Sequence, residues 1–239
     1  MMEKIYTIPV NEAFDECAAD HSIGCPFCRL REKLEENELD LILGASMMEP
    51  DIRIKTNELG FCHSHYDKMF VRKNRLGMAL MLESHLDEVR KSLDGGMLTD
   101  LMKGKGAAAN DKLTKLEGTC YVCGRIDFSF RKMVENAVYL WEADDASRER
   151  TFERKIQAQP YFCLPHYNAF LSAGRDRLQK KKFNDFHKVV TDVVAAYFDE
   201  LRGDVSWFCK KFDYRYENED WGNSKDAVER AIKFLCGRD

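Results

Sequence analysis

The chain has 239 residues, of which 44% are hydrophobic and 33% are charged, and its formal net charge is −4. Only 14 glycines and 5 prolines occur, so the composition excludes collagen-like and Pro/Gly-rich disordered chains and favours long helices. The slightly acidic balance excludes a bulk electrostatic case for nucleic-acid binding.

The N-terminal stretch MMEKIYTIPV contains no apolar run of the kind that forms a signal-peptide core. No other segment approaches the ~20 apolar residues of a membrane-spanning helix. We therefore expect a cytoplasmic protein without a membrane partner. In such a reducing compartment, the nine cysteines indicate metal or redox chemistry rather than a disulfide framework.

Four short motifs hold six of the nine cysteines. They are a CxxC at Cys25 and Cys28, a CxxH at Cys62 and His65, a CxxC at Cys120 and Cys123, and a CxxH at Cys163 and His166. The gaps between CxxC and CxxH are 33 and 39 residues, and each CxxH follows a phenylalanine and precedes a tyrosine. This repeated order indicates an internal duplication.

Each duplicated unit is predicted to read CxxC, helix, loop, CxxH, helix. Apolar residues recur at helical spacing after each CxxC, until Pro50 and Pro160 mark the loops. The strongest apolar stripe runs from Phe186 to Leu201 with helical periodicity. A last helix is predicted to bury Ala227, Val228, Ala231, Ile232 and Leu235. Because no segment alternates with a period of two, we expect an all-α fold, a helical bundle of two pseudo-repeats with a C-terminal helical tail.

The predicted domain organisation follows the duplication. The first CxxC/CxxH unit covers residues 1–93, and the second unit with its tail covers residues 119–239. The segment between them, residues 94–118, is rich in glycine and poor in aromatic residues, which is typical of a linker.

Six thiolates and two imidazoles suit two tetrahedral Cys3His zinc sites. The expected pairing joins each CxxC to the CxxH that follows it, and the repeat register favours His65 over His63. The expected ligand sets are Cys25, Cys28, Cys62 and His65 for one ion, and Cys120, Cys123, Cys163 and His166 for the other. The exchanged pairing, in which each CxxC shares an ion with the CxxH of the other unit, is an alternative that the sequence leaves open.

Other chemistries of the same cysteines are weaker alternatives. An iron–sulfur cluster also uses cysteine sets, but the dense run of bacterial ferredoxins is absent. The CPxC at Cys25 is similar to the dithiol site of glutaredoxin-like proteins, which requires a βαβ context. Oxidation of the thiolates with loss of zinc is a further redox alternative. Cys17, Cys209 and Cys236 lack partners at ligand spacing and are expected to be buried structural thiols.

No catalytic residue is predicted, because four ligands close each site whereas a catalytic zinc keeps an open position. A metalloenzyme or redox protein is the alternative from another class. Basic residues follow each CxxH, from Lys68 to Arg75 and from Arg175 to Lys188. We interpret them as solvated helix faces that balance acidic helices, so a protein partner is favoured over a nucleic acid.

The motif pairs, together with a C-terminal stretch from Lys211 to Gly237, resemble a family of uncharacterised bacterial cytosolic proteins, a domain of unknown function. That stretch contains the elements Phe-Asp-Tyr-Arg and Trp-Gly-Asn-Ser. The resemblance spans nearly the whole chain and supports the fold and metal predictions, but it implies no activity or ligand. The sequence therefore predicts a zinc-stabilised helical interaction or regulatory module whose metals are mainly structural.

Overall fold

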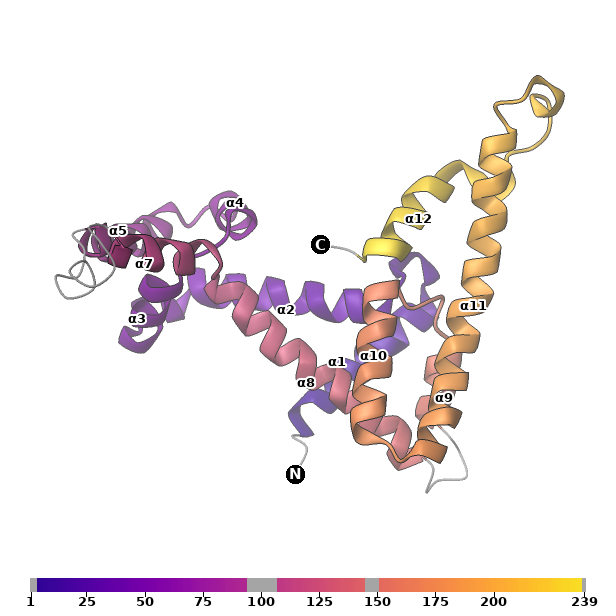
Figure 1. Ribbon diagram of the computed structural model, residues 1–239, viewed down its shortest axis with the longest axis horizontal. Coiled ribbons are helices and arrows are strands. Elements are labelled where there is room, and N and C mark those ends of the chain that lie inside the picture. Colours follow the sequence, from indigo (N-terminus) through magenta and orange to yellow (C-terminus); the bar gives the residue numbers. More distant parts are fainter. Residues whose placement is uncertain (1–3, 94–106, 145–150, 238–239) are drawn as a thin grey trace. The chain divides into compact units, whose positions relative to one another are not determined.

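A computed structural model of the chain describes residues 4–93, 107–144 and 151–237 (Figure 1). Within these ranges the chain forms eleven α-helices, five short 3-10 helices and no strand. The prediction of an all-α fold is therefore confirmed. No helix of the described ranges combines the length and the apolar character that crossing a membrane requires.

The chain forms two compact units. Unit 1 comprises residues 1–32 and 130–239, and unit 2 comprises residues 33–129. The boundaries fall inside α2 (Pro26–Leu43) and α8 (Tyr121–Asp144), so each of these helices contributes to both units. The predicted division follows the order of the motifs and differs from these units, because a boundary inside a continuous helix carries no glycine or proline signal.

Unit 1 is built around an aromatic core. Its other helices are α1 (Thr7–Ala19), α9 (Thr151–Gln157), α10 (Leu164–Arg177), α11 (Lys180–Lys210) and α12 (Ala227–Cys236), with η1 (Lys4–Tyr6), η2 (His21–Ile23), η4 (Tyr214–Tyr216) and η5 (Gly222–Asp226) between or beside them. Five fully buried phenylalanines from α1, α2, α10, α11 and the segment before α10 form the core. They are Phe14, Phe27, Phe162, Phe170 and Phe186.

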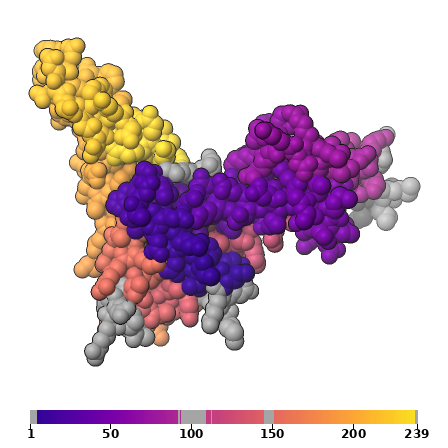
Figure 2. Space-filling view, turned by 180° about the vertical axis from the view of Figure 1, so that it is seen from behind, coloured from indigo at the N-terminus to yellow at the C-terminus, as the bar shows by residue number. Residues whose placement is uncertain are grey.

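Segments far apart in the sequence lie side by side in unit 1. Helix α1 packs against α9, and Figure 2 shows the N-terminal segment in indigo next to this salmon-coloured part of the chain. The ammonium group of Lys155 bonds the side chains of Asn11 and Asp15 at 2.8 and 2.7 Å. The N-terminal helix is thus part of the same core as the C-terminal half of the chain.

Unit 2 has a smaller core of aliphatic residues. Its other helices are η3 (Ala45–Met48), α3 (Pro50–Leu59), α4 (His63–Val71), α5 (Arg75–Leu93) and α7 (Ala107–Glu117). The buried cluster consists of Leu39, Ile42, Leu43, Met69, Met81, Tyr121, Val122 and Ile126. Residues 94–106 of the predicted linker lie outside the described residues, whereas residues 107–117 form α7, which packs on α5.

The apolar periodicity of the sequence predicts the buried face correctly for helix α11 but not for helix α12. On α11, Phe186, Val190, Val194 and Leu201 are buried, as the apolar stripe predicts. On α12 the prediction is wrong for three residues that are 41–57% exposed, Val228, Ile232 and Leu235. Helix α12 carries two apolar stripes, and the one that contains Phe234 is buried, because this ring packs against two tyrosines of the same unit, Tyr161 and Tyr197.

Candidate metal centres

The sulfur and imidazole groups of the four motifs gather in two clusters. Site 1 consists of Cys25, Cys28, Cys163 and His166, and site 2 consists of Cys62, His65, Cys120 and Cys123. In each cluster one ligand atom from every residue lies within 4.8 Å of the others. All eight residues that the sequence selects are therefore in these clusters, and each cluster could hold a metal ion.

The expected pairing of each CxxC with the following CxxH is wrong, and the exchanged pairing is the one found. The reason is the length of α2. Its 18 residues extend about 27 Å at 1.5 Å per residue and take the chain from unit 1 into unit 2 before the first CxxH. That CxxH therefore meets the CxxC at the start of α8, and the last CxxH meets the CxxC at the start of α2.

Every motif lies at the first turn of a helix. Cys62 is the N-cap of α4 and Cys163 is the N-cap of α10, while Cys25 and Cys120 directly precede α2 and α8. The carbonyl of each leading cysteine accepts the first helical hydrogen bond, at 2.8–3.1 Å. Because residues three apart share a face of a helix, the second ligand of each motif points to the same side as the first. The positive ends of these helix dipoles also favour thiolates.

Site 1 is buried on all sides. The Nδ1 atom of His166 is 3.2 Å from the sulfur of Cys163, 3.4 Å from that of Cys28 and 3.7 Å from that of Cys25. The sulfurs of Cys28 and Cys163 are 3.7 Å apart. The exposed fractions are 1% for Cys25, 5% for Cys28, 0% for Cys163 and 8% for His166. Solvent therefore has almost no access to the sulfur atoms of this cluster.

Aromatic rings and a glycine cover site 1. The rings of Phe27 and Phe130 pack against its imidazole, with centroids 6.1 and 5.0 Å away. Gly237, which ends α12 with φ +84°, lies so close that a Cβ atom there would be 3.5 Å from the sulfur of Cys163. A glycine fits this position because it adopts positive φ without strain. The end of α12 thus forms one wall of the site.

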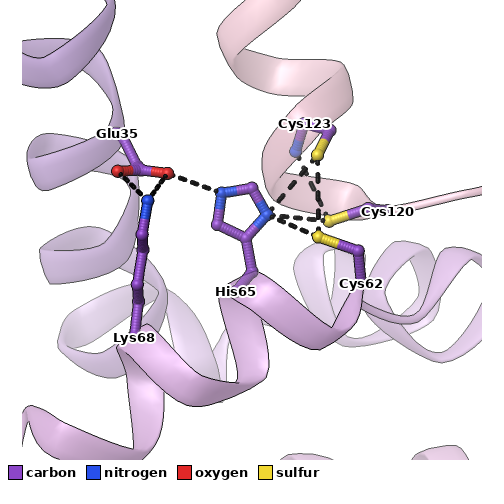
Figure 3. Close-up of polar contacts among 6 residues, drawn as sticks. All are labelled: Glu35, Cys62, His65, Lys68, Cys120 and Cys123. Carbon is purple, nitrogen blue, oxygen red and sulfur yellow. Dashed lines mark hydrogen bonds and ion pairs between the residues drawn. The ribbon is translucent and has the colours of Figure 1, made fainter. Parts of the chain in front are cut away.

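Site 2 is more open and has a different imidazole environment (Figure 3). Nδ1 of His65 is 3.2 Å from the sulfurs of Cys62 and Cys120 and 3.4 Å from that of Cys123. His65 itself is buried. Cys62 and Cys123 are partly exposed, whereas the ligand group of Cys120 is buried. His63 is not part of the cluster, because its side chain is 93% exposed and pairs with Asp67.

An ion pair holds the other nitrogen of His65. Nε2 lies 3.1 Å from a carboxylate oxygen of Glu35, and Nζ of Lys68 donates to both oxygens of that carboxylate at 2.7 Å (Figure 3). A carboxylate on the far nitrogen fixes the tautomer of a ligating imidazole and makes it a stronger ligand. In the sequence, Glu35 and Lys68 are indistinguishable from ordinary solvated charge, and the one signal for this ion pair is that Lys68 lies one helical turn after His65.

The sulfurs of the two sites differ in how readily they carry charge. Hydrogen bonds from the sulfurs of Cys163 and Cys25 lower the pKa of Cys28, so site 1 favours a thiolate at Cys28. Burial raises the pKa of Cys25 well above its usual value, and the nearby sulfur atoms add to the effect. Burial, followed by the neighbouring sulfurs of site 2, raises the pKa of Cys123 to about 12. A bound divalent cation lowers these raised pKa values, because it attracts the thiolate form directly. Crowded thiols of this kind are thus suited to a metal ion.

The spacing fits a single tetrahedral ion. With Zn–S bonds of about 2.3 Å and Zn–N bonds of about 2.0–2.1 Å, tetrahedral ligand atoms lie about 3.5–3.8 Å apart. The sulfur–sulfur and sulfur–nitrogen distances quoted above, including 3.9 Å between Cys62 and Cys123, are 3.2–3.9 Å. An iron–sulfur cluster spreads its protein ligands over two or more irons, which requires wider separations than these.

The remaining three cysteines differ from one another. Cys17 is buried in unit 1, as expected, but Cys209 and Cys236 are exposed, so the prediction that they are buried structural thiols is wrong. Both lie on the solvent side of amphipathic helices, α11 and α12. They are therefore accessible to thiol reagents even though neither belongs to a cluster.

The whole chain, residues 1–239, matches the family of unknown function DUF6062. The chain belongs to this family, so the predicted membership of a family of unknown function is confirmed. No curated protein and no solved structure shows significant similarity to the chain. The geometry of the two sites is therefore the basis for the function.

Proposed function

We propose that each site binds one zinc ion, and that the protein is a zinc-stabilised helical interaction module. The donor set of three sulfurs and one imidazole nitrogen is the kind that zinc prefers. In each cluster the four ligand atoms lie within 4.8 Å of one another, and the pairs given above are 3.2–3.9 Å apart, which fits a tetrahedron around a single ion. This spacing is the observation that carries the proposal and favours zinc over an iron–sulfur cluster.

The proposed role of both ions is mainly structural. Four protein ligands leave no open position for a substrate or a water molecule, which a catalytic zinc requires. Each ion joins two helix starts that are distant in the sequence, α2 with α10 at site 1 and α4 with α8 at site 2. Each ion thereby adds its binding free energy to the stability of the hydrophobic core of its unit. Because thiolate ligands need reducing conditions, we also propose a cytoplasmic location.

We propose a protein rather than a nucleic acid as the partner. The basic residues after the first CxxH are neutralised in part, since Lys68 pairs with Glu35 and Arg72 pairs with Asp40. The lysines at the start of α11 share a cavity of about 590 Å³ with four acidic side chains, Asp144, Glu153, Asp185 and Asp192. Part of the positive charge of each region is thus compensated, which weakens the case for phosphate binding.

Elemental analysis of natively purified protein tests the metal proposal. We expect two zinc atoms per chain and a colourless protein. Apparent zinc-binding free energies of about 10–16 kcal/mol exceed the net stability of about 5–15 kcal/mol of a typical domain. Complete chelation should therefore lower helicity and melting temperature. Iron with visible absorbance, or unchanged melting after metal removal, contradicts the proposal.

The partner class is tested separately. An electrophoretic mobility assay with a salt titration is expected to show no binding with the steep salt dependence of phosphate contacts. In affinity capture, an Ile232→Ser variant is expected to lose a protein partner that the wild type retains, because Ile232 is 57% exposed on α12. The zinc content of this variant should equal that of the wild type, which separates loss of the surface from loss of the fold.

A further inference from the structure

The two clusters are alike in donor atoms but differ in access from solvent. At site 1 the three cysteines have exposed fractions of 0–5%. At site 2 Cys62 and Cys123 are partly exposed, whereas the ligand group of Cys120 is buried. Zinc-bound thiolates are nucleophiles, and their reaction with a dissolved reagent depends on whether the reagent can reach the sulfur.

We propose that site 2 is a thiol-modification site, whose cysteines react with peroxides and soft electrophiles and release the metal, while site 1 stays intact. This proposal rests on the zinc binding proposed above. It adds that the ion at site 1 has a structural role only, whereas the ion at site 2 is released when its ligands are modified. The reactive groups are the thiolates of Cys62 and Cys123, the two cysteines of the site that are partly exposed.

Distance alone does not separate the sites. The sulfurs of Cys62 and Cys123 at site 2 are 3.9 Å apart, and those of the corresponding pair at site 1, Cys28 and Cys163, are 3.7 Å apart. Both pairs are near enough to form a disulfide after small side-chain movements. The two sites differ in solvent access, because aromatic rings and the backbone at Gly237 enclose site 1.

The reaction with a peroxide balances within site 2. One thiolate of the Cys62–Cys123 pair attacks an oxygen of hydrogen peroxide, and the O–O bond breaks. The attacked oxygen stays on the sulfur as a sulfenic acid, and the other oxygen leaves as hydroxide and takes up one proton to give the first molecule of water. The second thiolate attacks the sulfenic sulfur and displaces hydroxide, which becomes the second water on protonation. Two electrons leave the two sulfurs, one peroxide is reduced, and the zinc loses two of its four ligands.

The oxidised site keeps its helices connected. Cys62 is the N-cap of α4, and Cys123 lies in the first turn of α8. A disulfide between them links the same two helix starts that the zinc ion joined. Cys120 and His65 are left as two ligands, which are too few to hold zinc tightly. Zinc release from unit 2 is therefore expected without complete unfolding of that unit.

The experiment uses the zinc-loaded full chain with Cys209→Ser and Cys236→Ser, which remove the two exposed thiols outside the sites. Bound zinc is counted first by native mass spectrometry, so a protein without zinc contradicts the proposed function and not this inference. The protein is then treated with limiting N-ethylmaleimide or hydrogen peroxide, and released zinc is followed with a colorimetric indicator.

We expect release of one zinc per chain, with peptide mapping that places the adducts, or the peroxide-induced disulfide, on the site 2 cysteines. Modification of site 2 should be about tenfold or more faster than that of Cys25, Cys28 and Cys163, because thiol reactivity requires access. In the same background, Cys62→Ser should release no zinc in this early phase. Equal rates at both sites, or earlier modification of site 1, would overturn the proposal.

Discussion

The two metal centres have the same donor set, three sulfurs and one imidazole nitrogen, but they lie in different protein environments. At site 1 the imidazole of His166 packs against phenylalanine rings of the aromatic core of unit 1. At site 2 the imidazole of His65 is held by the Glu35–Lys68 ion pair, and two of the three cysteine ligands, Cys62 and Cys123, are partly exposed. Site 1 is therefore suited to hold the fold of unit 1 permanently, whereas site 2 has a polar outer environment that can tune the metal.

The largest effect is expected from removing a ligand of site 1. Cys163→Ser leaves an incomplete ligand set at the centre of the unit 1 core, next to the fully buried Phe162 and Phe170. We expect the zinc content to fall from two to one and the cooperative melting of unit 1 to be lost. Native mass spectrometry and thermal denaturation followed by circular dichroism measure the two changes. A variant with two zincs and wild-type melting contradicts a structural site 1.

A smaller effect is expected from the equivalent change at site 2. Cys62→Ser should also remove one zinc, but the aromatic core of unit 1 does not depend on that ion. We expect partial loss of helicity and of hydrogen-exchange protection restricted to residues of unit 2. If hydrogen exchange instead rises across unit 1 to the same extent, the proposal that site 1 stabilises unit 1 independently of site 2 is wrong.

A third prediction concerns the stability of the turn at Gly24, which precedes the first CxxC and contributes no metal ligand. Gly24 has φ +85°, and a Cβ atom there would lie 2.7 Å from the hydroxyl oxygen of Tyr161. Gly24→Ala should destabilise unit 1 by about 1–3 kcal/mol, because this backbone region is nearly restricted to glycine. Denaturant unfolding measures the change.

The matched control for that turn is Gly203→Ala in the middle of α11, where an added Cβ meets no atom within 4 Å. It should stabilise the helix by about 0.5–1 kcal/mol, because alanine is the better helix former. Equal destabilisation by both substitutions would show that the turn before Cys25 is not a special position.

The smallest effect on folding is expected at the outer environment of site 2. Glu35→Gln keeps the shape of the side chain but removes the charge that orients His65. Zinc affinity at site 2 should fall about 10–100-fold with site 1 unchanged, as measured by competition with a chromophoric chelator. Glu36→Gln, an exposed neighbour on α2, is the matched control. Equal affinities of the two variants would show that the carboxylate of Glu35 does not tune the metal.

Local features of these sites could be predicted from the sequence, but their pairing could not. CxxC and CxxH place two ligands in one helical turn, so the eight residues and the helix starts were readable from spacing. The pairing depends on where α2 and α8 end, and within-unit and exchanged pairing use the same ligands. The Glu35–Lys68 ion pair joins α2 to α4 and has no local signature, because each residue alone resembles ordinary surface charge.

The last helix shows a similar limit. Helix α12 has one apolar stripe with Ala227 and Phe234 and another with Val228, Ile232 and Leu235. Periodicity detects both stripes but does not decide which one is buried. That choice depends on the tyrosines of distant segments that receive the ring of Phe234.

Zinc counting in two double variants tests the exchanged pairing most directly. Cys62 and Cys120 belong to one site, whereas Cys28 and Cys62 belong to different sites. We therefore expect Cys62→Ser/Cys120→Ser to retain one zinc per chain and Cys28→Ser/Cys62→Ser to retain none. The opposite result, no zinc in the first variant and one in the second, would contradict the exchange and restore the pairing of each CxxC with the CxxH that follows it.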